Sequence, residues 1–232
     1  MAVLRIGAGN VYIANKVRRR AVARAAGLKC HSWGWSEGTN LGPLIRRRTD
    51  YHALWPMFGF KDMRDATDCP MMLRKGLQLR HFQMTQVCDD SNPTKVAHDR
   101  VFSVLAYKWN GITVAHIQIH PNAVNPYDSP TMGVVKEFVK SMIRLNHMME
   151  FCEAMGWVLV VTGDFNLAPR RDKDYLTMYD LFTAHNMKWK VSGVDGIAWN
   201  DKKLRLVKYY PIKARPYGSD HPYWTVADFA RR

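Results

Sequence analysis

A carboxylate and an amide lie two residues apart where an apolar segment ends, in the run Gly163-Asp-Phe-Asn166. The mostly apolar or β-branched residues of 157–162 predict a buried strand, and Gly163 permits a turn at its end. Residues two apart in a strand share a face, so Asp164 and Asn166 are expected to project together. Such a pair can bind a hard cation, orient a water molecule or hold a phosphate oxygen. A lone aspartate here could instead form a turn or cap a helix.

A second polar cluster, Ser219-Asp220-His221, lies directly before the apolar run 223–226 near the end of the chain. Each cluster adjoins a segment expected to be a strand. Two clusters in this position are less readily explained as chance turn residues than one, although each short motif alone is a weak signal.

The chain is strongly basic, with 34 lysines and arginines against 20 acidic residues and a net charge of +14. An excess of this size suggests a polyanionic partner. Arginine runs at 18–20 and 46–48, and the pair Arg170 and Arg171 after the Asp/Asn motif, concentrate the charge. Phosphate contacts by such residues give affinity without sequence preference. For any single run, a solvated basic face that aids solubility is the alternative.

The length of 232 residues and the hydrophobic fraction of 47% fit one α/β domain. No Pro/Gly/Ser-rich stretch divides the chain, so we expect a single domain over residues 1–232. Residues 1–6 are too short for a signal peptide, and no apolar run approaches membrane-spanning length, which predicts a soluble, cytoplasmic protein with no membrane partner. The four cysteines lack zinc or disulfide spacing and are expected to be reduced thiols.

Most of the elements expected to carry these residues are strands. Helical spacing of apolar residues predicts helices at 15–27 and 134–155, with a weaker one near 175–186. Trp109-Asn110-Gly111 predicts a hairpin turn, and the strand after it ends on His120. Because strands outnumber helices and form hairpins, mixed sheets fit better than a parallel array. Strands are expected at 1–6, 71–88, 101–107, 112–120 and 157–161, and after His221.

This order of residues resembles the endonuclease/exonuclease/phosphatase (DNase I-like) family, and the resemblance spans almost the whole chain. Gly-Asp-Phe-Asn and Ser-Asp-His are its specific elements. The context of two single residues departs from the family pattern: Gly rather than Trp precedes Asn10, and Ser rather than Gln precedes Glu37. The residues that carry the resemblance are Asn10, Glu37, His120, Asp164, Asn166, Asp195, Asp220 and His221.

The resemblance implies a four-layer α/β/β/α sandwich of two mixed sheets flanked by helices, with the active site at one edge. It further implies that Glu37, Asn10 and Asp220 hold Mg²⁺ or Mn²⁺ through oxygen ligands. Asp195 would then hydrogen-bond His221, and Asp164 or His221 would accept a proton from the attacking water. Asn166 would orient the water or the phosphate, and His120 would donate a hydrogen bond to a phosphoryl oxygen. For His120 a plain strand-end role and for Asp195 a turn role are the alternatives.

The implied activity is metal-dependent hydrolysis of a phosphodiester. The basic charge favours a nuclease, acting on DNA in preference to RNA, with Arg170, Arg171 and Arg215 binding the substrate. Trp33, Trp35 and Trp55 could stack on bases, although the core is the better expectation for most of the eight tryptophans. Two other functions stay open: a phosphatase or phosphodiesterase for a small or lipid phosphate, and a nucleic-acid-binding protein that has lost turnover.

Overall fold

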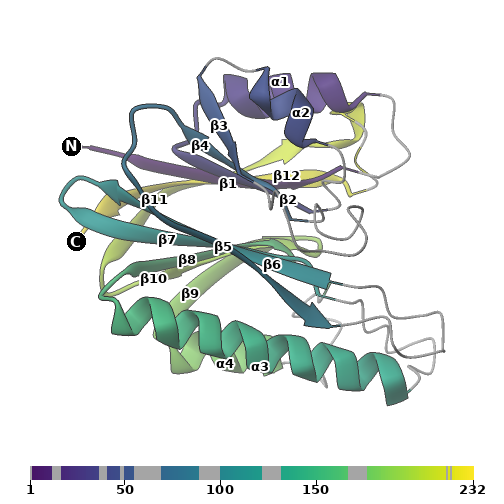
Figure 1. The fold of residues 1–232 in the computed structure, drawn as a ribbon, viewed down its shortest axis with the longest axis vertical. Coiled ribbons are helices and arrows are strands. Elements are labelled where there is room, and N and C mark those ends of the chain that lie inside the picture. Colours follow the sequence, from purple (N-terminus) through teal and green to yellow (C-terminus); the bar gives the residue numbers. More distant parts are fainter. Residues whose placement is uncertain are drawn as a thin grey trace.

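Two six-stranded mixed sheets pack face to face, and helices cover the outer side of each (Figure 1). This arrangement, seen in a computed structural model, confirms the predicted α/β/β/α sandwich. It explains why many strands are apolar on both faces, since each sheet is covered on both sides. The structure describes residues 2–11, 17–36, 41–47, 50–54, 69–88, 100–121, 132–166, 177–217, 219 and 221–232.

The first sheet contains β1 (Leu4–Asn10), β2 (Ser32–Ser36), β3 (Tyr51–Leu54), β4 (Met71–Arg74), β11 (Leu204–Lys213) and β12 (Tyr223–Arg231). Their order is β11-β12-β1-β2-β4-β3. β1 runs parallel to β2 and antiparallel to β12, so segments from both ends of the sequence lie side by side. Helices α1 (Arg18–Gly27) and α2 (Gly42–Arg46) cover the outer face (Figure 1).

The second sheet contains β5 (Leu79–Cys88), β6 (Arg100–Trp109), β7 (Ile112–Ile119), β8 (Val158–Asp164), β9 (Met187–Ser192) and β10 (Asp195–Asn200). Their order is β5-β6-β7-β8-β10-β9. β7 and β8 are parallel because α3 (Met132–Ala154) connects them, and β10 returns antiparallel to β8. Helix α4 (Thr177–Ala184) lies with α3 on the outer face of this sheet.

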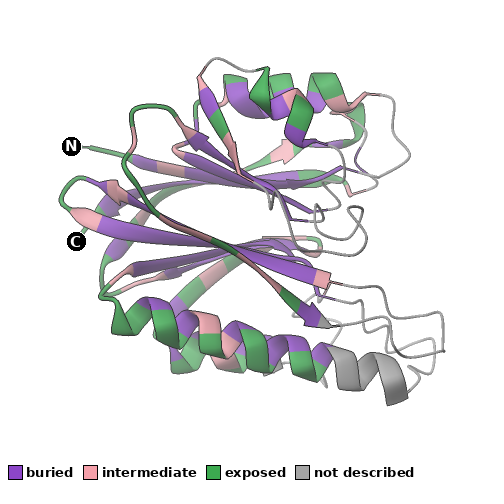
Figure 2. Ribbon diagram, in the orientation of Figure 1, coloured by how far each residue is buried: buried purple, intermediate pink, exposed green. Residues whose placement is uncertain are grey.

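Three hydrophobic clusters hold the layers together. One lies between the sheets and includes Leu4, Phe229, Leu105 and Val160. The others join α3 and α4 to the second sheet and α1 and α2 to the first. The strands are mostly buried, whereas each helix alternates between a buried inner side and an exposed outer side (Figure 2). No helix in the described ranges is long and apolar enough to cross a bilayer.

Several predicted elements appear where the sequence placed them. Asn110 and Gly111 both have positive φ, 45° and 79°, as the two-residue turn of the β6–β7 hairpin requires. The strand β8 and the helices α1, α3 and α4 also match. Two predictions were wrong in detail: the first strand, expected at 1–6, runs from Leu4 to Asn10, and the strand expected at 71–88 is two strands, β4 and β5, with a turn between them. β2, at residues 32–36, was not among the expected strands.

Candidate active site at the ends of the strands

Asp164 is the last residue of β8 and is only 2% exposed. The preceding residue, Gly163, has φ +140°, and a Cβ there would lie 1.9 Å from the carbonyl oxygen of Ile119. Glycine therefore permits β7 and β8 to approach each other closely at their ends. Since Ile119 and Gly163 are register partners, the residues that follow them, His120 and Asp164, emerge next to each other.

His120 faces the carboxylate of Asp164. Its Nε2 lies 3.5 Å from Asp164 Oδ2, and both side chains are almost completely buried. On the other side of the ring, Arg100 Nη1 lies 2.8 Å from His120 Nδ1. Because a guanidinium can only donate, Nδ1 must accept, and the neutral ring then carries its hydrogen on Nε2. Arg100 thus directs an N–H of His120 toward Asp164.

His221 approaches the same carboxylate oxygen from another strand end. Its Nε2 lies 3.4 Å from Asp164 Oδ2, and its Nδ1 lies 2.7 Å from Asp195 Oδ2. Asp195 opens β10, where it is the register partner of Asp164, so the two buried carboxylates face His221 together. The hydrogen bond from Nδ1 to Asp195 fixes the orientation of the ring.

Burial raises the pKa of Asp195 above its usual range, and the negative charge of Asp164 acts in the same direction. The hydrogen bond and positive charge of His221 lower that pKa again. A charged Asp195 in this low-dielectric site therefore depends on its imidazole partner. The two groups form one electrostatic unit.

Asn166 does not continue the strand, and the predicted period-two placement beside Asp164 was wrong. Its φ is +53°, and its backbone N–H donates to Asp164 Oδ1 at 2.8 Å, which closes a tight turn. The side-chain Nδ2 donates to the carbonyl oxygen of Pro121 at 2.7 Å. Asn166 thus holds one oxygen of Asp164 in place and ties the turn to the segment that follows His120.

Asn10 ends β1 and is fully buried, yet neither its Oδ1 nor its Nδ2 has a hydrogen-bond partner in the described structure. Its backbone carbonyl accepts from Trp224 Nε1 at 2.9 Å. A Cβ at Gly9 would lie 2.7 Å from the Trp224 ring, and one at Gly7 would lie 2.4 Å from Trp33. The glycines that precede Asn10 are thus explained by two buried tryptophans that need the space.

The predicted metal site is described only in part, because Glu37 and Asp220 lie outside the described residues. Among those that are described, no group of three or more His, Cys, Asp or Glu side chains is arranged to hold a metal. The unpaired Oδ1 of Asn10 does fit the expected group, because a buried amide oxygen without a donor is costly unless a cation or water satisfies it. Asn10 is also the register partner of Ser36, the residue before Glu37.

Only one of the predicted substrate-binding arginines lies among the described residues. Arg170 and Arg171 lie outside the described residues, whereas Arg215 is exposed in the short 3-10 helix Arg215–Tyr217 just before Ser219. Trp33 and Trp35 are fully buried and pack with Trp224, so the core interpretation holds for them; Trp55 lies outside the described residues. Cys30, Cys69 and Cys152 are buried cysteines.

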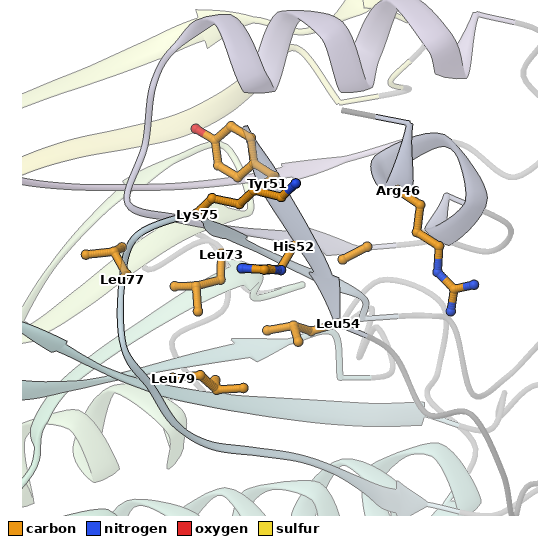
Figure 3. A pocket seen from close by; sticks show the side chains of 9 residues that line it. Arg46, Tyr51, His52, Leu54, Leu73, Lys75, Leu77 and Leu79 are labelled. Carbon is orange, nitrogen blue, oxygen red and sulfur yellow. The ribbon is translucent and has the colours of Figure 1, made fainter. Parts of the chain in front are cut away.

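A separate cavity of about 520 Å³ lies between the edge strands β3 and β5 (Figure 3). Its walls combine leucines such as Leu54 and Leu73 with the basic side chains of Arg46, His52 and Lys75. Of the predicted catalytic and metal-binding residues that the structure describes, none lines it. It is therefore distinct from the cluster around Asp164.

Arg100 and a set of polar residues behind Asp164 were not predicted from the sequence. Arg100 contacts His120 across the sheet, and nothing in its local sequence indicates that role. Gln118 and His116 did leave a signal, because together with His120 they alternate with apolar residues along β7. In a fully buried strand, a polar residue at every second position indicates a polar face turned toward the interior.

No protein-family model matches the sequence, and no curated protein matches it. Solved structures do resemble it. The endonuclease/exonuclease/phosphatase from Bacteroides vulgatus is 16% identical, with a TM-score of 0.74 and 100% of each chain covered. The mannosyl-6-phosphatase of Bacteroides thetaiotaomicron is 12% identical, with a TM-score of 0.71 and 99% of each chain covered.

A third similar structure is D. rerio TDP2 complexed with a single-strand DNA product, which is 11% identical with a TM-score of 0.66. The match covers 99% of this chain and 100% of that one. At such low identities the likeness concerns the fold, which confirms the resemblance stated from the sequence. The chain has the fold of the endonuclease/exonuclease/phosphatase, DNase I-like proteins.

Proposed function

We propose that this protein is a divalent-metal-dependent phosphoester hydrolase, and that its substrate is a nucleic acid. One observation carries the proposal: Asp164 Oδ2 lies close to the Nε2 atoms of two imidazoles, 3.5 Å from His120 and 3.4 Å from His221, with Asp195 behind the second. A buried carboxylate beside two N–H donors can remove a proton from water while the donors stabilise charge on phosphate oxygens.

Asp164 is the better candidate for the base. His221 gives its Nδ1 hydrogen to Asp195, so its contact with Asp164 is attractive only when Nε2 also carries a hydrogen. His221 in that state is a cationic donor rather than a proton acceptor. Asp164 would take the proton of the attacking water, and the Nε2–H groups of His120 and His221 would bind phosphoryl oxygens.

Glu37, Asn10 and Asp220 would hold Mg²⁺ or Mn²⁺, which when bound would stabilise the negative charge that develops on the leaving oxygen. The unpaired Oδ1 of Asn10 supports its part in this set. Asn166 would act indirectly, since its backbone N–H keeps Asp164 Oδ1 occupied and leaves Oδ2 directed at the two histidines.

The distribution of charge supports a polymeric substrate. Arg205, Lys208, Lys213 and Arg215 are exposed along β11 and just beyond its end, close in sequence to Ser219 and His221. A strand of this length spans about 30 Å, several times a Debye length of about 8 Å. Charge spread over such a path suits a nucleic-acid backbone better than a compact head group. The net charge of +14 points the same way.

A small phosphate monoester is the second candidate, because a mannosyl-6-phosphatase has the same fold. Supercoiled plasmid, linear DNA, RNA and mannose 6-phosphate should therefore be incubated with the protein in Mg²⁺ or Mn²⁺, with and without EDTA. We expect cleavage of nucleic acid that EDTA abolishes and that weakens steeply as salt rises.

Release of inorganic phosphate from the sugar, without cleavage of nucleic acid, would assign the second function instead. Salt-dependent retention of DNA in a gel with no product in either metal would reject hydrolysis altogether. Cleavage that persists in EDTA would reject the metal.

A further inference from the structure

A chain of buried hydrogen bonds connects the two sheets directly behind the candidate active site. At one end, the backbone N–H of Asp164 donates to Ser36 Oγ at 3.2 Å, and Gln118 Nε2 donates to the same oxygen at 3.0 Å. Gln118 Oε1 accepts from Thr162 Oγ1 at 2.7 Å. Ser36 belongs to the first sheet, and the other three residues belong to the second.

The chain continues away from the site through a histidine. His116 Nε2 lies 2.6 Å from Thr162 Oγ1, and His116 Nδ1 lies 2.8 Å from Ser32 Oγ, which in turn contacts Tyr107 Oη at 2.9 Å. Because Thr162 donates to Gln118, its oxygen is free to accept from His116 Nε2–H, and Nδ1 then accepts from Ser32. Burial lowers the pKa of His116 to about 3, consistent with a neutral ring.

These polar side chains are fully buried between the hydrophobic sheets. Buried polar groups are costly unless each is satisfied, and a satisfied network favours one arrangement of the surrounding strands. The packing makes room for it: a Cβ at Gly34 would lie 2.0 Å from Gln118 Oε1, so only glycine lets that side chain cross to the first sheet. Apolar residues at these positions would also pack the sheets together, without the free-energy cost of burying polar groups. Packing of the sheets alone therefore does not explain this chain of hydrogen bonds.

The location of Ser36 indicates what this chain of hydrogen bonds does. Ser36 is the last residue of β2, the register partner of Asn10 and the residue before Glu37. Its hydroxyl therefore connects two parts of the site. One is the pair of strand ends that are expected to hold the metal, and the other is Asp164, the expected base. The two halves of the site belong to different sheets. This hydroxyl is a direct hydrogen-bonded link between them. His221, which follows Asp220, forms another link through its bond to Asp195.

We infer that Ser36 and Gln118 are positioning residues that fix the separation between the metal-binding half of the site, on the first sheet, and Asp164, on the second. The inference rests on the proposed hydrolase function for its catalytic consequence. Neither residue needs to contact the substrate. Loss of either bond would let the end of β8 shift relative to β2, so that substrate still binds while the reacting groups are less well aligned.

The test compares Ser36→Ala with Ser103→Ala. Ser103 is also fully buried between the sheets, faces Gln118 across β6 and β7, and donates to the carbonyl oxygen of Cys69 instead of joining the chain. We expect Ser36→Ala to lower kcat by about 10-fold with KM changed by less than about twofold. Ser103→Ala should leave kcat unchanged. Gln118→Met removes one of the two bonds that Ser36 Oγ accepts, the one from Gln118 Nε2, and keeps the test decisive if Ser36→Ala does not fold.

Amide hydrogen exchange gives a readout that does not need activity. Exchange at the Asp164 N–H should accelerate by about 10-fold or more in Ser36→Ala and stay unchanged in Ser103→Ala. Equal kcat and equal exchange in the wild type and Ser36→Ala, or the same losses in both serine variants, would overturn the inference. Full hydrolysis by Asp164→Asn would instead overturn the proposed function. The exchange data would still decide whether the chain of hydrogen bonds holds the backbone of Asp164 in place.

Discussion

Replacing Asp164 with asparagine is expected to lower kcat by about 1,000-fold or more while the protein stays folded. Asparagine has nearly the same shape and keeps an oxygen that can accept from the N–H of Asn166, so the turn after β8 should persist. It cannot accept a proton from water, and it removes the negative charge between the two imidazoles. The measurement is the rate of product formation at saturating substrate.

A matched control is Asp201→Asn, since Asp201 forms surface ion pairs with Lys188 and Arg232 away from the candidate site. It should retain the wild-type rate, because surface pairs contribute little to stability. Thermal unfolding should be cooperative for both variants. An Asp164→Asn protein that keeps more than about a tenth of the wild-type kcat would exclude Asp164 as the base.

His221 and Asp195 should behave as a unit in a double-mutant cycle. We expect His221→Ala and Asp195→Asn each to lower kcat by about 100-fold or more, because the first removes a donor and the second leaves the ring without its buried partner. The double variant should be within about threefold of His221→Ala, since Asp195 acts through the imidazole.

The cycle is measured from kcat values of the four proteins under one set of conditions. Effects that multiply, so that the double variant loses far more than His221→Ala, would show that Asp195 acts independently of His221. In that case the contact of 2.7 Å between them would be structural rather than catalytic.

Local signals predicted several strands and turns, such as the strand before Gly163 and the Asn110-Gly111 hairpin turn, because buried strands and glycine turns leave strong patterns. The four layers were expected only from the family resemblance. β2 was missed for a physical reason. Trp33 and Trp35 pack with Trp224 among the tryptophans beneath the helices, while Ser32 and Ser36 take part in hydrogen bonds between the sheets. Alternation is present in Ser-Trp-Gly-Trp-Ser, but its polar side faces the interior instead of water, contrary to the usual interpretation of such a pattern.

Long-range partners could not be predicted in the same way. The contact of Arg100 with His120 depends on how the strands align, and that alignment is set by the whole sheet. The pairing of Asp195 with His221 was expected only from the family resemblance, whereas the structure supplies the distance. Asn166 differed from expectation because its left-handed backbone ends the strand, which no period-two count can detect.

In the proposed reaction, water attacks phosphorus at the Asp164 centre. The decisive experiment is to cleave the best nucleic-acid substrate in oxygen-18-enriched water with Mg²⁺ or Mn²⁺ and to determine the masses of the products by mass spectrometry. We expect one heavy oxygen per cleavage, located in the phosphate, and no product with EDTA or with Asp164→Asn. Heavy oxygen in the released hydroxyl instead of the phosphate, or equal labelling by Asp164→Asn, would contradict the proposed reaction.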